Sequence, residues 1–203
     1  MLNLIYCGKG GLPNGIPGLA RCLRKLALTN CVTRALCVAW ALAASAIGQS
    51  APTLTHTDVF VSGKDGYHTY RIPAIEAAPD GSLIAFAEAR KYNADDPGFG
   101  RQDIDLVYKR STNNGATWSP MTVLEDPGEL WSAANAATVV DRTNRRFWVF
   151  YLRSRPGRST DTARPGTDDM QTLARWSDDN GQAWTEPLDL TPVARDQGAP
   201  AWR

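Results

Sequence analysis

Ser111-Thr-Asn-Asn-Gly-Ala-Thr-Trp118 recurs 66 residues later as Ser177-Asp-Asp-Asn-Gly-Gln-Ala-Trp184. Both copies read Ser-x-Asp/Asn-x-Gly-x-x-Trp, and each follows a strand-like run. We interpret the frame as a self-contained turn: the Asp or Asn side chain accepts backbone N–H groups, Gly supplies positive φ, and Trp folds back as an apolar plug. Repeats at this scale favour a β-propeller with about 40–50 residues per blade. The longer spacing predicts an insertion, placed at 153–169.

Short strands and tight turns make up the rest of the body, so the predicted class is all-β. An Asp-Gly pair between two β-branched or apolar runs is a strong hairpin signal, because Gly adopts positive φ without steric cost. The predicted strands are 70–76 and 83–88 around Pro79-Asp80-Gly81, 137–141 and 146–151 around 142–145, and a further strand at 104–110.

Composition sets limits on function. The chain has 203 residues, of which 43% are hydrophobic and 21% charged, the mix of a soluble globular protein. Its net charge of +1 excludes a strongly basic nucleic-acid-binding protein. All four cysteines precede residue 47, so the body has neither a disulfide framework nor a thiolate metal site. The two histidines, His56 and His68, lack metal-ligand spacing, and we predict no metal and no other cofactor.

Residues 1–46 are interpreted as an N-terminal extension and signal peptide. They contain five basic and no acidic residues. Arg34 precedes the uncharged run 35–47, and Ala44-Ser45-Ala46 has the small-x-small pattern of a cleavage site. A membrane span needs about 20 apolar residues, more than this run offers. We therefore expect cleavage near Ala46 and a secreted or periplasmic protein with its folded body at 47–203. The Gly- and Pro-rich start indicates either a long leader or translation from Val32.

From about Phe60 onward the chain resembles the N-terminal portion of a sialidase (exo-α-neuraminidase). Tyr70-Arg71-Ile72-Pro73 comes first, and the two turns correspond to the family's Asp boxes, or BNR repeats. Further matching stretches are Ala87–Arg90, Asp103–Val107 and Asn135–Arg142. Each motif alone is weak or moderate, whereas their order and spacing are specific. The resemblance implies a six-bladed β-propeller, of which this chain supplies a part. Asn113 replaces the usual Asp of the first box, a mild change because both side chains accept turn hydrogen bonds.

The substrate class explains why arginines matter. A terminal sialic acid carries a carboxylate on its anomeric carbon, and a guanidinium binds carboxylate through two parallel N–H bonds while remaining charged. The family uses three arginines, and the first, in Tyr/Phe-Arg-Ile-Pro, matches Arg71. Arg90 matches an arginine that lines the pocket near the ring hydroxyls of the sugar. Outside these motifs either arginine would be interpreted as an ordinary surface or structural residue.

The resemblance also implies an aspartate as general acid/base, five or six residues after the second arginine. Asp95 and Asp96 both fit, and spacing does not choose between them. We favour Asp96 because it directly precedes the loop that leads back to residue 103. Such an acid protonates the leaving oxygen and later activates water. The Asp-Asp-Pro-Gly run also resembles an ordinary solvated turn. Trp131 and Asn135 are candidates for the N-acetyl or glycerol side of the pocket, although Trp131 is equally a candidate core residue.

Four functional groups of the family remain unassigned. Sialidases attack with a Tyr, since a carboxylate nucleophile would carry the same charge as the substrate. In the family this Tyr, its Glu partner and the other two arginines follow the second Asp box. We therefore expect this chain to be an incomplete and inactive part of an enzyme that hydrolyses terminal α-linked sialic acids, with retention, from glycoproteins, glycolipids or oligosaccharides. The alternatives are a non-catalytic, glycan-binding Asp-box propeller and an inactive remnant. Arg71 together with Asp95 or Asp96 weighs against pure binding, which needs no acid.

Overall fold

A computed structural model describes residues 54–194 of the chain. Every element below lies in the unit Thr55–Arg203. The predicted signal peptide, its cleavage site near Ala46 and all four cysteines lie outside the described residues, as does the segment 195–203.

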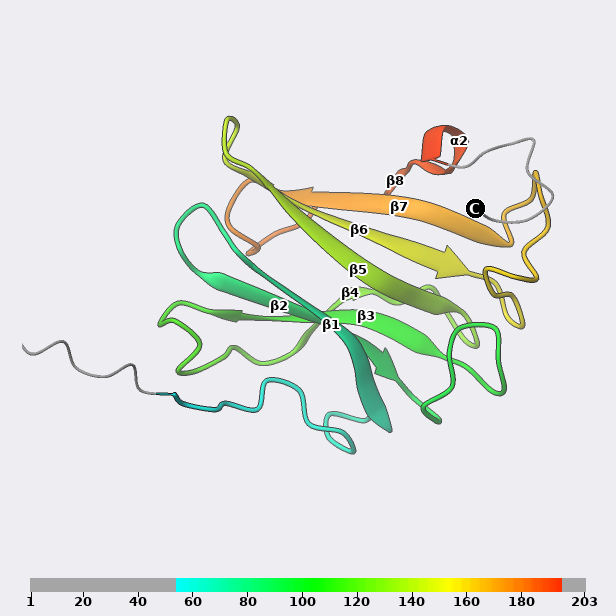
Figure 1. Cartoon of the computed structure of the whole chain (residues 1–203), viewed down its shortest axis with the longest axis horizontal. Helices are drawn as coiled ribbons and strands as arrows, with labels where there is room; N and C mark the ends of the chain where they lie inside the picture. Colours follow the sequence, from blue (N-terminus) through cyan, green and yellow to red (C-terminus); the bar gives the residue numbers. More distant parts are fainter. Residues whose placement is uncertain (1–53, 195–203) are drawn as a thin grey trace, which may run out of the picture. The chain divides into compact units, whose positions relative to one another are not determined.

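Nearly all regular structure in the described chain is β-strand (Figure 1). The elements are β1 (Thr69–Ala77), β2 (Leu83–Arg90), β3 (Ile104–Ser111), β4 (Thr122–Glu125), β5 (Ser132–Asp141), β6 (Arg146–Ser154), β7 (Met170–Ser177), β8 (Leu188–Asp189) and the one-turn helix α2 (Thr191–Ala194). The all-β prediction is confirmed. Within residues 54–194, no helix has the length and apolar character needed to span a membrane.

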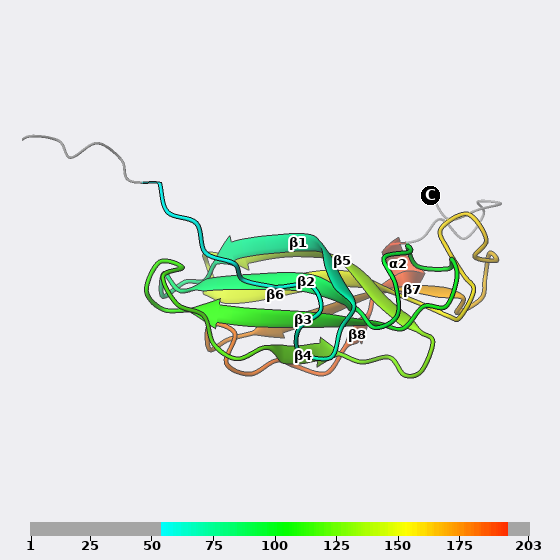
Figure 2. The same ribbon diagram turned by 90° about the horizontal axis from the view of Figure 1, so that it is seen from below.

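The strands form two four-stranded antiparallel groups in chain order, β1-β2-β3-β4 and β5-β6-β7-β8. A single parallel pairing, Ile104 with Ser132, joins the groups. Four antiparallel strands in up-and-down order make a propeller blade. The two blades overlap in the view of Figure 2 and do not close into a ring, which is the arrangement of a partial β-propeller.

Both predicted hairpins are present. In the β1–β2 turn, Gly81 has φ 85° and Asp80 Oδ1 accepts the Ser82 N–H at 2.9 Å. In the β5–β6 turn, Asp141 Oδ1 accepts the Thr143 N–H at 2.8 Å. Strand β5 starts five residues earlier than predicted, at Ser132. Its first half is Ser-Ala-Ala-Asn, which lacks the β-branched residues that mark a strand in a sequence. The predicted insertion corresponds to loop 155–169, between β6 and β7.

The repeated frame folds into the same turn twice, once per blade. In each copy the Ser hydroxyl accepts the Gly N–H, and the Asn or Asp side chain accepts an N–H two residues after that Gly. These distances are 2.9 Å for Gly115 to Ser111, 2.9 Å for Thr117 to Asn113, 2.7 Å for Gly181 to Ser177 and 2.9 Å for Ala183 to Asp179. The glycines have φ 82° and 81°, a region where a side chain is strained. Asn113 therefore serves the turn as Asp179 does.

The apolar core lies between the two blades and is closed by Trp184. Its ring makes edge-on contacts with Phe86, Tyr108 and Phe147, each at a centroid distance of 5.8 Å. The core thus combines side chains of both blades with the plug from the second turn. Trp118, the equivalent of Trp184 in the first turn, is half-buried and donates its ring N–H to the Gly115 carbonyl at 3.1 Å.

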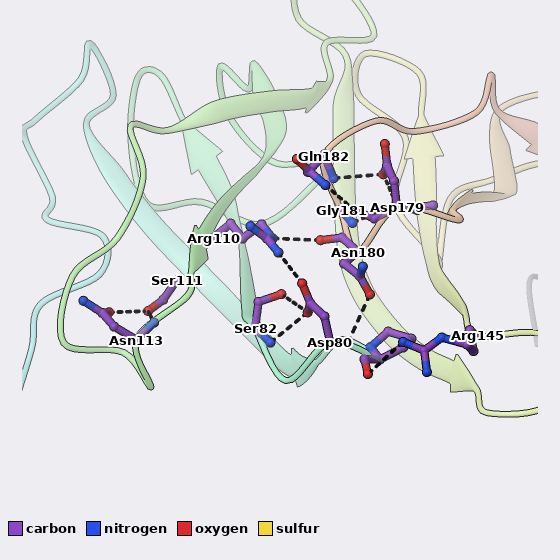
Figure 3. Close-up of polar contacts among 12 residues, drawn as sticks. Asp80, Ser82, Arg110, Ser111, Asn113, Arg145, Asp179, Asn180, Gly181 and Gln182 are labelled. Atoms are coloured by element: carbon purple, nitrogen blue, oxygen red, sulfur yellow. Dashed lines mark hydrogen bonds and ion pairs between the residues drawn. The ribbon is translucent and has the colours of Figure 1, made fainter.

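Polar contacts join the second turn to the other blade (Figure 3). Arg110 of β3 donates to the Asn180 carbonyl at 2.9 Å and to Asp80 Oδ2 at 2.7 Å. Asn180 Oδ1 in turn accepts the Asp80 N–H at 3.2 Å. The second repeated turn is therefore bonded to the first hairpin, which fixes one blade against the other.

Candidate active site

A cavity of about 310 Å³ opens between the blades, near the start of β1, the end of β2 and the start of β5. Its wall combines two arginines and three acidic side chains with small polar and apolar groups. The lining residues are Arg71, Ile72, Glu88, Arg90, Asp96, Pro97, Phe99, Ala134, Asn135, Leu152, Ser154, Ser159, Thr160, Asp161 and Met170.

Two strand irregularities shape the wall. The β1–β2 register shifts between Arg71 and Ala74, and the β5–β6 register shifts between Ala134 and Ala137. Within these bulges Ile72 has φ 50° and Asn135 has φ 58°. Positive φ is a genuine outlier for a β-branched residue and costs about 1–3 kcal/mol. Bulges re-aim side chains next to functional sites, and both bulges here border the same cavity.

Arg71 presents a partly exposed guanidinium to the cavity, with 40% of its side chain accessible. Its Nη1 donates to the Ala94 carbonyl at 2.8 Å and to Asp96 Oδ1 at 2.9 Å. Its Nε and Nη2 groups donate to no protein atom among the described residues. This arginine can therefore accept an anionic ligand without losing all of its present contacts.

Glu88 and Arg90 form a buried ion pair at the end of β2, with 1% and 2% of their side chains accessible. Glu88 Oε2 accepts Arg90 Nη2 at 2.5 Å and Nε at 3.1 Å. Glu88 Oε1 accepts the Asn135 N–H at 2.9 Å, which secures the bulge of β5. Glu88 was not among the predicted site residues. The sequence did offer one indication of this role. Glu88 precedes Arg90 by two positions, and residues two apart in a strand lie on the same face.

The two neighbouring aspartates have different surroundings. Asp96 lines the cavity, and its Oδ1 lies 2.9 Å from Arg71 Nη1 and 3.0 Å from Arg90 Nη2. Asp95 does not line the cavity. Its Oδ2 lies so close to Gly100 that a Cβ there would come within 2.4 Å of it. Of the pair that spacing left open, Asp96 has the carboxylate that faces both arginines.

The insertion loop 155–169 forms a second part of the wall, which the sequence did not assign to the site. It contributes Ser159, Thr160 and Asp161 to the lining. Asp169 ends the loop with 1% of its side chain accessible, and it accepts Arg164 Nε at 2.8 Å and Nη2 at 3.0 Å. The hydrogen bonds from Arg164 hold the pKa of the Asp169 carboxyl well below its usual range, against the opposing effect of its burial.

The insertion loop also contacts the loop that carries Asp96. A Cβ on Gly98 would lie 2.6 Å from the Arg158 carbonyl carbon, so only glycine allows this approach. The buried Gln102 accepts the Gly98 N–H and donates to the carbonyls of Leu130 at 3.0 Å and Arg155 at 3.3 Å. The two cavity loops are therefore packed together.

The structure brings Arg71, Arg90, Asp96 and Asn135 to one cavity but not Trp131. Trp131 precedes β5, and the Arg155 guanidinium lies over its ring at 5.4 Å from the centroid. Trp131 is therefore not part of the lining of this cavity. Over residues 54–194, no cluster of three or more His, Cys, Asp or Glu side chains suits a metal ion.

Comparisons with known proteins give a consistent result. No protein-family model matches the chain. A sialidase of Micromonospora viridifaciens is 30% identical over 164 residues, covering 75% of this chain and 24% of the relative. An exo-alpha-sialidase of Aspergillus fumigatus is 33% identical over 147 residues, covering 62% of this chain and 34% of the relative. The solved Hadza microbial sialidase Hz136 superposes with a TM-score of 0.61 at 28% identity, covering 67% of this chain and 29% of that one.

The open pair of blades with an arginine-lined cavity defines part of a sialidase-type β-propeller. The chain belongs to the sialidase family. It spans 24% and 34% of the lengths of the two curated relatives above.

Proposed function

We propose that this cavity is one half of an exo-α-sialidase active site, which hydrolyses terminal α-linked sialic acids with retention. The observation that carries the proposal is the convergence of Arg71 and Asp96: a partly exposed guanidinium and a carboxylate from separate segments, 2.9 Å apart in one cavity. The relatives named sialidase and exo-alpha-sialidase support the same reaction class.

In this proposal Arg71 binds the carboxylate of the sugar. Its free Nε and Nη2 groups suit a carboxylate, which accepts two parallel N–H bonds from one guanidinium. Asn135, on the facing bulge, supplies an amide for the polar substituents of the ring.

Asp96 is proposed as the general acid/base. It protonates the leaving glycosidic oxygen and then removes a proton from the attacking water. A substrate carboxylate can bind Nε and Nη2 of Arg71 while Asp96 Oδ1 stays on Nη1. Asp96 Oδ2, which accepts no hydrogen bond among the described residues, then remains for proton transfer. Asp95 is the less suitable candidate because its carboxylate lies against Gly100 and not in the cavity.

The described residues supply only part of the machinery that sialidases use. A retaining sialidase attacks with a tyrosine, and the described cavity lining contains none. We propose that the Tyr nucleophile, its Glu partner and two further arginines belong to the other half of the site. The proposed substrates are sialylated glycoproteins, glycolipids or oligosaccharides outside the cell, in keeping with the secretory signal predicted at residues 1–46.

A glycan-binding function without catalysis is the second candidate. Its support is that Arg71 offers free donors for an acidic sugar, whereas the described cavity lining contains no tyrosine nucleophile. Both candidates require a bound acidic sugar and differ only in turnover.

Binding to the 203-residue chain is the first test. The α-methyl glycoside of N-acetylneuraminic acid is titrated with ¹⁵N-labelled protein, and N-acetylmannosamine serves as the neutral control. The proposal predicts shifts at residues 71, 88–99 and 134–135 with the acid only. Equal shifts with both sugars, or none, contradict it. In a longer protein that also supplies the other half of the site, release of a fluorogenic sialoside aglycone, lost in Arg71→Lys and Asp96→Asn, then separates catalysis from pure binding.

A further inference from the structure

Phe99 is an exposed aromatic residue in the cavity wall to which the proposed reaction gives no role. It lines the cavity together with Pro97, and 56% of the residue is accessible. Neither apolar core cluster contains it. Single exposed apolar residues are common on protein surfaces, so exposure alone means little. A large apolar ring in the wall of a charged cavity, however, suggests a contact with a ligand.

The backbone places Phe99 beside the proposed general acid. The Phe99 N–H donates to the Asp96 carbonyl at 3.0 Å, and Gly98 between them has φ 90°. A proline in the second position and a glycine of positive φ in the third are typical of a type II β-turn, whose first and last Cα atoms lie less than about 7 Å apart. Asp96 therefore begins the turn that Phe99 ends.

This turn is tightly packed on both sides of Phe99. On one side, Gln102 accepts the Gly98 N–H, and a Cβ on Gly98 would lie 2.6 Å from the Arg158 carbonyl carbon. On the other side, a Cβ on Gly100 would lie 2.4 Å from a carboxylate oxygen of Asp95. The backbone of Phe99 is thus held in place, whereas its ring is exposed.

Tyr92, the other exposed aromatic residue of this loop, provides the contrast. The Arg101 guanidinium lies over the Tyr92 ring at 3.8 Å from the centroid, and Tyr92 does not line the cavity. Over residues 54–194, no cation and no second ring lies against Phe99. The Tyr92 ring has a partner within the protein, and the Phe99 ring is available to a ligand.

We propose that Phe99 is a specificity-determining residue that stacks against the leaving group, the sugar to which the sialic acid is attached. The inference rests on the proposed function of Asp96. A general acid lies about 3 Å from the oxygen that it protonates, and this glycosidic oxygen is bonded to the leaving sugar. The leaving sugar therefore lies beside Asp96, within reach of the ring at the other end of the same turn.

The chemistry of a pyranose suits this contact. One face of a pyranose ring presents C–H groups, whereas the faces of an aromatic ring carry negative charge. Stacking buries apolar surface of both rings and needs no charged group. The cavity should therefore prefer a sialic acid linked to a second sugar over one linked to a small group such as methyl.

Two ligands test this preference in the 203-residue chain: 3′-sialyllactose and the α-methyl glycoside of N-acetylneuraminic acid. Wild type should bind sialyllactose about three- to tenfold more tightly than the methyl glycoside. Phe99→Ala should lose this preference and keep its affinity for the methyl glycoside. Tyr92→Ala is the matched control and should keep the preference, because Tyr92 lies outside the cavity lining. Phe99→Trp retains an aromatic face and should also keep it.

Three results overturn the inference. Wild type binds both ligands equally, Phe99→Ala retains the preference, or Phe99→Ala loses affinity for both ligands by the same factor. The last result would place Phe99 beside the sialic acid itself.

Lactose alone separates this inference from the proposed function, because it contains the leaving sugar without the acid. At high concentration it should shift the ring resonances of Phe99 and leave those of Tyr92 unchanged. If wild type binds no sialoside, the proposed function fails, and a lactose shift at Phe99 still supports the contact with a neutral sugar. No shift at Phe99 with either lactose or sialyllactose overturns the inference.

Discussion

Asp96 Oδ1 lies 2.9 Å from Arg71 Nη1, although the two residues are 25 positions apart and come from a loop and a strand. The cavity therefore has a carboxylate of the protein on the arginine that is proposed to bind a substrate carboxylate. The two carboxylates compete for the charge of one guanidinium, so the negative charge of Asp96 opposes the binding of an acidic sugar even though Asp96 can stay on Nη1.

Asp96→Asn should strengthen the binding of an acidic sugar to the chain. The amide still accepts a hydrogen bond from Arg90 but no longer attracts Arg71 as an ion. Because the pair is partly exposed, the gain should be modest, about two- to fivefold in affinity. Asp95→Asn is the matched control, and its affinity for the acidic sugar should differ little from that of wild type. Calorimetric titration with an α-sialoside measures both, and weaker binding by Asp96→Asn contradicts the competition.

Asp169 should stabilise the insertion loop in a pH-dependent way. Its pKa is lower in the folded chain than in the unfolded chain, so its contribution is fully present above about pH 4 and is lost as the pH falls further, through the folded value. Asp169→Asn should cost about 2 kcal/mol at pH 7. Urea unfolding at several pH values should show a constant difference from wild type down to about pH 5 and a smaller one below pH 4. A difference that grows on acidification contradicts this.

Gly98→Ala should separate the two cavity loops. The added Cβ would lie 2.6 Å from backbone atoms of the facing loop. Gly157→Ala is the control, because its φ of 70° is also positive but nothing lies within 4 Å of a Cβ there. In both variants backbone strain should lower the free energy of unfolding by about 1 kcal/mol. Only Gly98→Ala should speed proteolysis of loop 155–169 and weaken sialoside binding; equal behaviour of the two variants contradicts the loop contact.

The two tryptophans of the repeated turns should differ in their effect on stability. Trp184→Ala removes the plug of the core between the blades and should lower the free energy of unfolding by about 3–5 kcal/mol. Trp118→Ala, at the half-buried equivalent position, should cost about 1 kcal/mol. Chemical denaturation measures both. Equal losses would show that the core does not depend on Trp184 in particular.

Local chemistry in the sequence was sufficient to predict much of the fold. The repeated turns depend on Ser, Asp or Asn, and Gly within eight residues, and the first hairpin depends on Asp80-Gly81. In both cases the bonds that define the conformation are made by neighbours in the chain. Arg71, which the family motif singled out, lines the cavity.

What the sequence did not predict depends on contacts between distant segments. Nothing in the residue type of Ile72 predicts positive φ, which the β1 bulge imposes. Gln102 joins three segments, and Asp169 fixes a loop that only the fold brings to the cavity. Arg90 donates two hydrogen bonds to backbone carbonyls of the loop that follows it, and no sequence pattern predicts the conformation of that loop.

The most direct measurement of the central claim is a cycle of two ligands and two proteins. The ligands are the α-methyl glycoside of N-acetylneuraminic acid and its methyl ester, and the proteins are wild type and Arg71→Lys. If Arg71 binds the carboxylate, wild type should prefer the acid over the ester by about tenfold or more, and Arg71→Lys should lose most of that preference. Equal affinity of wild type for acid and ester, or an unchanged preference in Arg71→Lys, would contradict the account.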